Sequence, residues 1–110
     1  MMPLFAEAAA RAAVAAHPDR PATAILHDSP DARLVVFRLA PGQSVSPHRS
    51  TSSVILHVLR GSGQLSGESA EQAVSTGDMV VYQPNELHGM RANDQELLLL
   101  ATITPRPGAR

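Results

Sequence analysis

The chain has 110 residues, of which 44% are hydrophobic and 17% charged, and its formal net charge is -1 at pH 7. This length predicts one domain with one hydrophobic core and excludes a second. The nine basic residues are all arginines spread along the chain, which argues against a nucleic-acid-binding face. The absence of cysteine excludes disulfides and thiolate ligands, so any transition-metal site must use histidine and oxygen donors.

The first sixteen residues are dominated by alanine, the strongest helix former. His17 precedes Pro18, and the residue before a proline is driven out of the helical region. The pattern predicts one helix between Leu4 and Ala16. Such a short helix is marginal alone in water, so we expect Leu4, Phe5 and Val14 to dock on the body of the protein or on a partner subunit.

The same segment bears on the compartment of the protein. Glu7 and Arg11 interrupt what would have to be the uncharged apolar core of a signal peptide, so we expect none. No apolar run approaches the roughly 20 residues that a membrane span requires. We therefore expect a cytoplasmic protein without a membrane partner.

After Pro21 the chain changes to short apolar or β-branched runs bounded by turn-forming residues, which is typical of strands. Turn chemistry such as Gly61-Ser62-Gly63 separates them. Many short strands predict a sandwich or barrel. The segments expected as strands are Ala22–His27, Arg33–Ala40, Val54–Leu59, Gly63–Ser66, Gln72–Val74, Met79–Gln83, Leu87–Ala92 and Glu96–Thr104.

Two stretches carry glycine and histidine at regular positions. The first runs from Gly42 to Gly61 and contains His48, and the second runs from Gly77 through a proline-containing turn to His88. Their spacing resembles the first and second motifs of the cupin family. The resemblance implies an all-β fold, an antiparallel jelly-roll (cupin) β-barrel, here with a short N-terminal α-helix. We assign residues 1–20 to the helix and linker, 21–105 to the barrel and 106–110 to a tail.

The resemblance also implies a metal site, but an incomplete one. In the family, three histidines and one carboxylate surround a divalent metal, usually iron, manganese, nickel or zinc. Only His48 and His88 match, whereas Ser50 stands at the second histidine position and Val54 at the glutamate position. A neutral hydroxyl is a poor ligand and valine has no donor. Any metal held by His48 and His88 is therefore expected to bind weakly and not to be obligatory.

Strand alternation places further residues near these positions. Residues two apart in a strand share a face, so Leu56 is expected to lie on the face of Val54 and Met90 on that of His88. His57 is expected on the opposite face. Tyr82 could act as an acid, although a lone tyrosine on a strand is more often a packing residue. The candidate ligand-binding residues are His48, Ser50, Val54, Leu56, Tyr82, His88 and Met90.

The leading functional hypothesis is a small-molecule-binding cupin whose ligand lies in the barrel near His48 and His88. One alternative is an enzyme, either a metal-dependent oxygenase, isomerase or lyase with a rebuilt ligand set or a metal-free isomerase. Another is a sensory or structural module. No catalytic residue is assigned, and whether the protein is an enzyme stays open. Because the run Val54–Leu59 is apolar on both faces, we also predict a homodimer.

Overall fold

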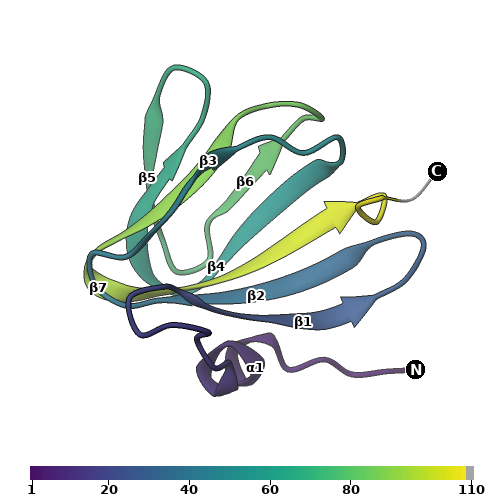
Figure 1. Ribbon diagram of the computed structural model, residues 1–110, viewed down its shortest axis with the longest axis horizontal. Coiled ribbons are helices and arrows are strands. Elements are labelled where there is room, and N and C mark those ends of the chain that lie inside the picture. The colour runs from purple at the N-terminus through teal and green to yellow at the C-terminus, as the bar shows by residue number, and fades with distance from the viewer. Residues whose placement is uncertain (109–110) are drawn as a thin grey trace.

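The computed structural model describes residues 1–108, which form a helix and seven strands (Figure 1). No helix in this range is long and apolar enough to cross a membrane. The elements are α1 (Ala6–Ala12), β1 (Ala22–Asp28), β2 (Arg33–Leu39), β3 (Ser44–His48), β4 (Ser53–Ser66), β5 (Glu71–Ser75), β6 (Met79–Tyr82) and β7 (His88–Thr104).

Two long strands, β4 and β7, organise the sheet by pairing with each other in antiparallel fashion. On the free side of β7, β2 pairs with its C-terminal half and β3 with its N-terminal half, so β2 and β3 run end to end. On the free side of β4, β5 and β6 run end to end in the same way. β1 extends the sheet beside β2. Every pairing is antiparallel, as predicted.

The central pair folds over on itself. Its register shifts between Val58 and Arg60 and again between Gly61 and Gly63, and Figure 1 shows β7 turning back near its middle. The halves of β4 and β7 before and after this bend therefore face each other as two layers. The edge strands of the described sheet do not pair with each other, so the jelly roll is a folded sheet that is not strictly closed.

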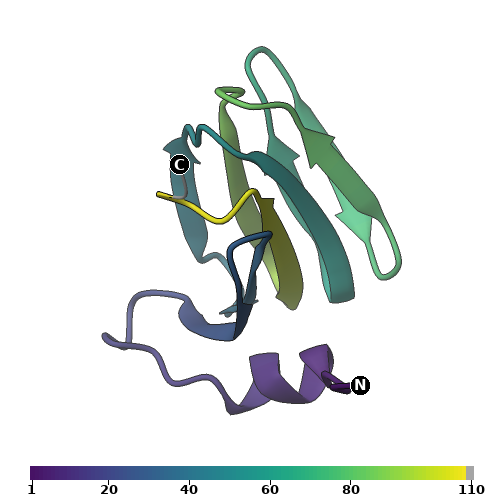
Figure 2. The same cartoon turned by 90° about the vertical axis from the view of Figure 1, so that its right-hand side faces the viewer.

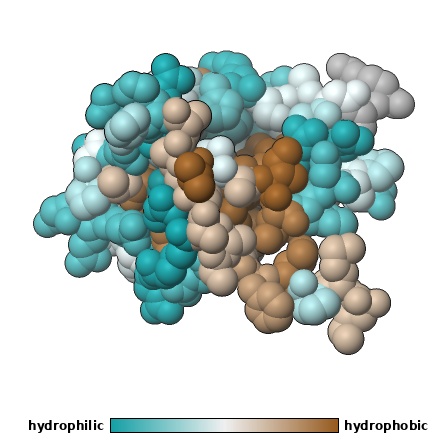
Figure 3. Space-filling model, turned by 60° about the horizontal axis from the view of Figure 1, so that its bottom comes forward, coloured by the Kyte–Doolittle hydropathy of each residue, from teal (hydrophilic) through white to brown (hydrophobic). Residues whose placement is uncertain are grey.

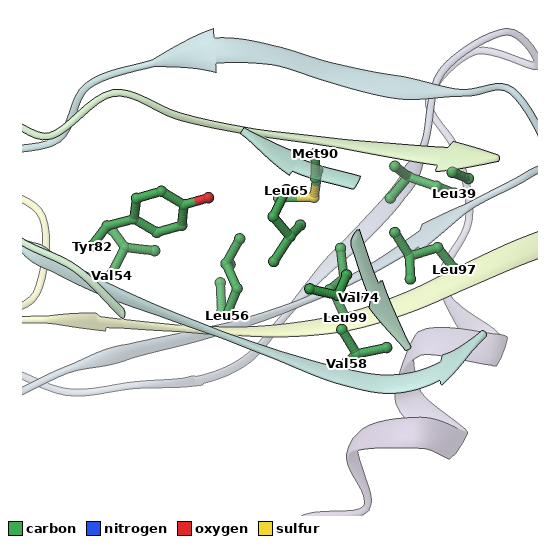
Figure 4. Close-up of a cluster of buried hydrophobic side chains, with 12 residues drawn as sticks. Leu39, Val54, Leu56, Val58, Leu65, Val74, Tyr82, Met90, Leu97 and Leu99 are labelled. Atoms are coloured by element: carbon green, nitrogen blue, oxygen red, sulfur yellow. The ribbon is translucent and has the colours of Figure 1, made fainter. Parts of the chain in front are cut away.

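The main hydrophobic core lies between these layers, where Figure 4 shows side chains from both halves pointing inward. Strand alternation accounts for it in β4, because Val54, Leu56 and Val58 are buried while the residues between them are only partly buried. His57 accordingly lies on the opposite face, as predicted. The buried members are Leu39, Val54, Leu56, Val58, Leu65, Val74, Tyr82, Met90, Ala92, Leu97, Leu99 and Ala101.

The predicted turn at Gly61-Ser62-Gly63 is wrong, because β4 continues through it. A Cβ at Gly61 would collide with the Glu96 carbonyl, and one at Gly63 with the Arg91 carbonyl. These glycines therefore mark a close approach of two backbones, a second common use of glycine in strands. The predicted strands Leu87–Ala92 and Glu96–Thr104 are likewise one strand, β7.

The expected strands also omitted β3, which contains Pro47. Proline cannot donate a ladder hydrogen bond and is therefore confined mostly to edge strands and bulges. β3 satisfies this condition, because it pairs only with β7 and its register shifts between Val45 and His48.

The helix is shorter than predicted, and it docks through different residues. Ala10 is fully buried against Val36 and Leu98, whereas Leu4, Phe5 and Val14 are 39%, 72% and 84% exposed. These three therefore do not dock on the body, and their docking on a partner subunit stays a prediction. The small Ala10 side chain lets α1 approach the sheet closely, and Figure 2 shows the helix beneath it.

A polar anchor supplements this small contact. Arg38 of β2 donates from one guanidinium nitrogen to the Ala10 carbonyl at 2.9 Å and to the Arg11 carbonyl at 2.7 Å. Carbonyls in the last turn of a helix lack partners within the helix, so a cation there satisfies them and complements the helix dipole.

The homodimer stays a prediction. Leu59, on the outer face of the run Val54–Leu59, packs against the cluster that contains Ala10, so α1 already covers part of that face. Met79 and Val81 on neighbouring β6 are 60% and 58% exposed. Figure 3, which views the α1 side, shows another gathering of hydrophobic side chains there.

Light scattering across a concentration series should report a dimer, and a monomer at every concentration would contradict this prediction.

Gly61 at the bend leads to a stability prediction, and Gly77, in the turn between β5 and β6, is its control. Gly77→Ala, at φ +94° with open space around its Cβ, should lower the free energy of unfolding by about 1–2 kcal/mol through left-handed strain alone. Gly61→Ala, at φ +97°, should cost about 3 kcal/mol or more, because a clash with the Glu96 carbonyl adds to the same strain. Urea unfolding of both variants tests this, and equal losses would show that the bend tolerates a Cβ.

Candidate ligand-binding cavity

A cavity of about 230 Å³ lies between the two layers of the sheet. Larger hollows exist on the outer surface, such as one of about 500 Å³ beside Arg60 and Thr76, but its lining is more polar. An apolar hollow with a few convergent polar groups is the usual form of a small-molecule site. Its lining residues are Phe37, His48, Ser50, Val54, Leu56, His88, Met90, Ala101, Ile103 and Pro107.

Six of the seven candidate residues line this cavity: His48, Ser50, Val54, Leu56, His88 and Met90. Figure 4 shows Val54, Leu56 and Met90 pointing into the space between the layers. Ser50 lies in the loop between β3 and β4 and not on a strand.

Tyr82 lies behind the cavity lining. Its ring centroid is 5.2 Å from that of His88, and its hydroxyl donates to the Ser66 carbonyl at 2.8 Å. Burial raises the pKa of the Tyr82 hydroxyl. The Tyr82 hydroxyl proton is therefore engaged in a hydrogen bond to the backbone. The Tyr82 ring packs near the His88 ring.

Four lining residues were not anticipated: Phe37, Ala101, Ile103 and Pro107. Ala101 and Ile103 enter because β7 places them opposite Leu56 and Val54. Alternation in the sequence assigns both to one face of their strand, but only the pairing register shows that this face meets the cavity. Pro107 belongs to the segment assigned as a tail, of which residues 109 and 110 lie outside the described part.

The two histidines meet because β3 and β7 place them directly opposite each other. Their ring centroids are 4.2 Å apart, with the ring planes inclined at 59°. His88 is only 4% exposed, while His48 is exposed at the outer side of the pair. The pair thus forms a polar border between the apolar cavity and solvent.

Backbone carbonyls determine which nitrogen of each ring carries the proton. The Nδ1 atom of His48 lies 3.0 Å from the Ser46 carbonyl oxygen, and that of His88 lies 3.1 Å from the Glu86 carbonyl oxygen. A carbonyl oxygen only accepts, so both Nδ1 atoms donate and both Nε2 atoms keep a lone pair in the neutral rings. The Nε2 atom of His88 has no hydrogen-bond partner within residues 1–108. Because no fully buried side-chain nitrogen in this range lacks a partner, this atom is not fully buried.

The cavity lining beside this pair carries no fixed charge, and the Glu86 carboxylate acts on His88 from outside the lining. Burial lowers the pKa of the His88 imidazole below its ordinary value of 6.5, against the opposing effect of its hydrogen bond to the Glu86 carbonyl, and the neighbouring His48 adds to the lowering. Apart from the two histidines, the described lining contains no titratable side chain. The described lining therefore offers no counter-charge to an ionised group.

An ion pair between Arg49 and Glu68 connects the segments that carry the two histidines. Glu68 accepts hydrogen bonds from the Arg49 guanidinium and, at 3.0 Å, from the Leu87 backbone N–H. Arg49 also donates to the Asn85 carbonyl at 2.8 Å. Arg49 directly follows His48 and Leu87 directly precedes His88, so Glu68 holds the two histidine segments together. The Arg49 guanidinium and the Leu87 N–H together hold the pKa of the Glu68 carboxyl below its usual range.

The donor set does not fit the four-ligand metal centre of the family. No group of three or more histidine, cysteine, aspartate or glutamate residues within residues 1–108 converges in a way that could hold a metal ion. Ser50 and Val54 line the cavity where the family places ligands, and only Ser50 offers an oxygen. Catalytic zinc sites, for comparison, use three protein ligands.

A family model described as Cupin domain matches residues 35–104, so the chain belongs to the cupin domain family. No curated protein sequence matches this chain. Solved structures share the fold, among them TT1209 from Thermus thermophilus, at 22% identity and TM-score 0.80 over 88% of this chain and 94% of that one.

Two further solved structures are similar to this chain. An RmlC-like cupin protein from Desulfovibrio desulfuricans has 26% identity and TM-score 0.77, with coverage of 86% of this chain and 92% of that one. A predicted oxalate decarboxylase from Thermotoga maritima has 25% identity and TM-score 0.72, with coverage of 77% and 80%. The family and fold are thereby established, and the chemistry must be argued from the cavity.

The lowered pKa of His88 predicts a pH-dependent stability. In the unfolded chain the imidazole binds its proton near pH 6.5, whereas in the folded chain it binds only at lower pH. His88 should therefore leave the free energy of unfolding unchanged above pH 6.5, and this free energy should decrease as the pH falls from 6.5 toward the lower pKa of the folded chain. Urea unfolding between pH 5 and 8 tests this, with His88→Gln expected to flatten the profile. An NMR titration placing the folded pKa above 6.5 would reverse the sign.

The Arg49–Glu68 ion pair leads to a prediction about the two histidine rings. Glu68→Ala should shift the ring NMR resonances of His48 and His88, because their segments lose a shared acceptor. Glu71→Ala is the matched control, since it breaks another exposed pair, with Arg91 at 3.4 Å. Exposed pairs contribute little to global stability, so both variants should unfold close to the wild type. Unchanged ring resonances in Glu68→Ala would show that the histidines are positioned without it.

Proposed function

We propose that this chain is a small-molecule-binding cupin that holds its ligand in the cavity beside His48 and His88, without an obligatory metal. One observation carries the proposal: two imidazoles, whose Nε2 atoms have no hydrogen-bond partner within residues 1–108, converge at the border of a mostly apolar cavity of about 230 Å³. The apolar wall favours burial of a ligand, and the few polar groups give its orientation.

The size of the cavity supports an organic ligand. An apolar cavity of about 150 Å³ engineered in another protein binds benzene, so about 230 Å³ accommodates a single ring with a small substituent. Seven of the ten lining residues are apolar, which supplies the surface that such a ring would bury.

A metal-dependent enzyme is the second candidate. Both Nδ1 atoms donate to carbonyls, which is the arrangement that orients the Nε2 of a metal-ligating histidine. His48 and His88 would then hold iron, manganese, nickel or zinc through two imidazoles. With two protein ligands such binding is expected to be weak, so the metal-free reading remains the leading proposal.

Toluene tests the cavity itself. With methyl-labelled methionine, the Met90 methyl resonance should shift on titration with toluene, because Met90 lines the cavity and is 4% exposed. Ala101→Leu should weaken this binding at least tenfold by filling the space. Ala73→Leu adds the same volume at an exposed position on β5 and is the control. No response to toluene in the wild type would contradict a preformed apolar site.

Elemental analysis tests the role of the metal. Untagged protein purified without chelator should contain much less than one metal ion per chain, and the double variant His48→Ala/His88→Ala should lose what little is bound while still binding toluene. Stoichiometric metal that disappears in the double variant would favour the metal-dependent enzyme and remove the metal-free proposal.

A further inference from the structure

We infer that the ligand is a neutral, largely apolar single-ring molecule that carries one hydroxyl group, which binds between His48, His88 and Ser50. This inference rests on the proposed function and deepens it by naming a chemical class. It follows from the hydrogen-bonding capacity, the charge and the shape of the cavity, taken in turn.

The two histidines line the cavity, and each keeps one hydrogen-bond acceptor. Their Nδ1 protons are engaged by the Ser46 and Glu86 carbonyls, so the neutral rings present lone pairs on Nε2. A ligand without an O–H or N–H would displace water from these acceptors and give nothing in return, which costs free energy. The ligand should therefore bring at least one donor.

Ser50 offers the complementary group. Its Oγ accepts a hydrogen bond from the Ser52 backbone N–H at 3.1 Å, and its carbonyl accepts one from the Asn85 N–H at 2.7 Å, which fixes the loop at the cavity. The hydroxyl proton of Ser50 donates to no protein group within residues 1–108 and is available. A ligand hydroxyl both donates and accepts, so it can satisfy an imidazole Nε2 and Ser50 together.

The charges around the cavity exclude an ionised ligand. No arginine, aspartate or glutamate is among the described lining residues. Arg49, the nearest cation in the sequence, is engaged by Glu68 and by the Asn85 carbonyl. A carboxylate would have to leave water for a lining without arginine or lysine, and the Glu86 carboxylate, whose charge acts on His88, would repel it. An ammonium would find no carboxylate within the described lining.

The apolar wall favours a ring. Phe37 approaches the cavity from β2 and Met90 from β7, while Val54, Leu56 and Ile103 complete the sides. Aromatic edges and thioether sulfur both make favourable contacts with an aromatic ring. Together with the volume of about 230 Å³, this wall suits a substituted phenol or a cyclic alcohol.

The experiment compares four probes by the shift of the Met90 methyl resonance at pH 7.5. Phenol has the hydroxyl, anisole replaces its proton with a methyl group, toluene has no oxygen, and benzoate is ionised. Phenol should bind about tenfold more tightly than anisole or toluene, which is the effect of one net hydrogen bond, and benzoate should not bind. Ser50→Ala and His48→Leu should each reduce the preference for phenol over toluene, while Ser44→Ala, at an exposed position of β3, should leave it unchanged.

The outcomes separate this inference from the function on which it rests. Equal affinities for phenol, anisole and toluene would overturn the hydroxyl requirement and leave a binding cavity in place. Tightest binding of benzoate would overturn the neutral class. If none of the four shifts the Met90 resonance, the binding proposal itself fails. Toluene binding retained in His48→Leu would show that the variant still folds.

Discussion

The close approach of β4 to β7 at Gly61 and Gly63 is the constraint on which the structure depends. At both positions a carbonyl of β7 occupies the place where a side chain would begin. The two backbones can therefore come together where the register shifts, and both long strands turn back over themselves.

Folding one strand over itself explains how a short chain builds an interior site. The N-terminal half of β7 contributes His88 and Met90, and its C-terminal half contributes Ala101 and Ile103 to the opposite side of the same cavity. The pairing of β3 with β7 then brings His48 opposite His88. The loop between β3 and β4 adds Ser50, so the polar groups gather at the open end while the apolar core fills the bend.

The replacements in the cupin motif have a consistent chemical meaning. Ser50 and Val54 remove an imidazole and a carboxylate from the cavity, which leaves it without a fixed charge other than what the histidines acquire on protonation. The remaining histidines are held by the Ser46 and Glu86 carbonyls, and their segments are joined through Glu68. In the proposed function these hydrogen bonds hold both imidazoles in place and leave the two Nε2 atoms as acceptors for a neutral ligand.

The sequence by itself determined the family, the antiparallel class and most of the cavity. Motif spacing and strand alternation are local properties, so His48, Val54, Leu56 and Met90 could be assigned to the interior before any pairing was known. Only the tertiary structure decided the register that adds Ala101 and Ile103, the carbonyls that fix both imidazole tautomers, and the role of Gly61 as a close contact instead of a turn. These features depend on contacts between residues far apart in the chain, and a local pattern carries no information about which backbone a given glycine or imidazole will meet.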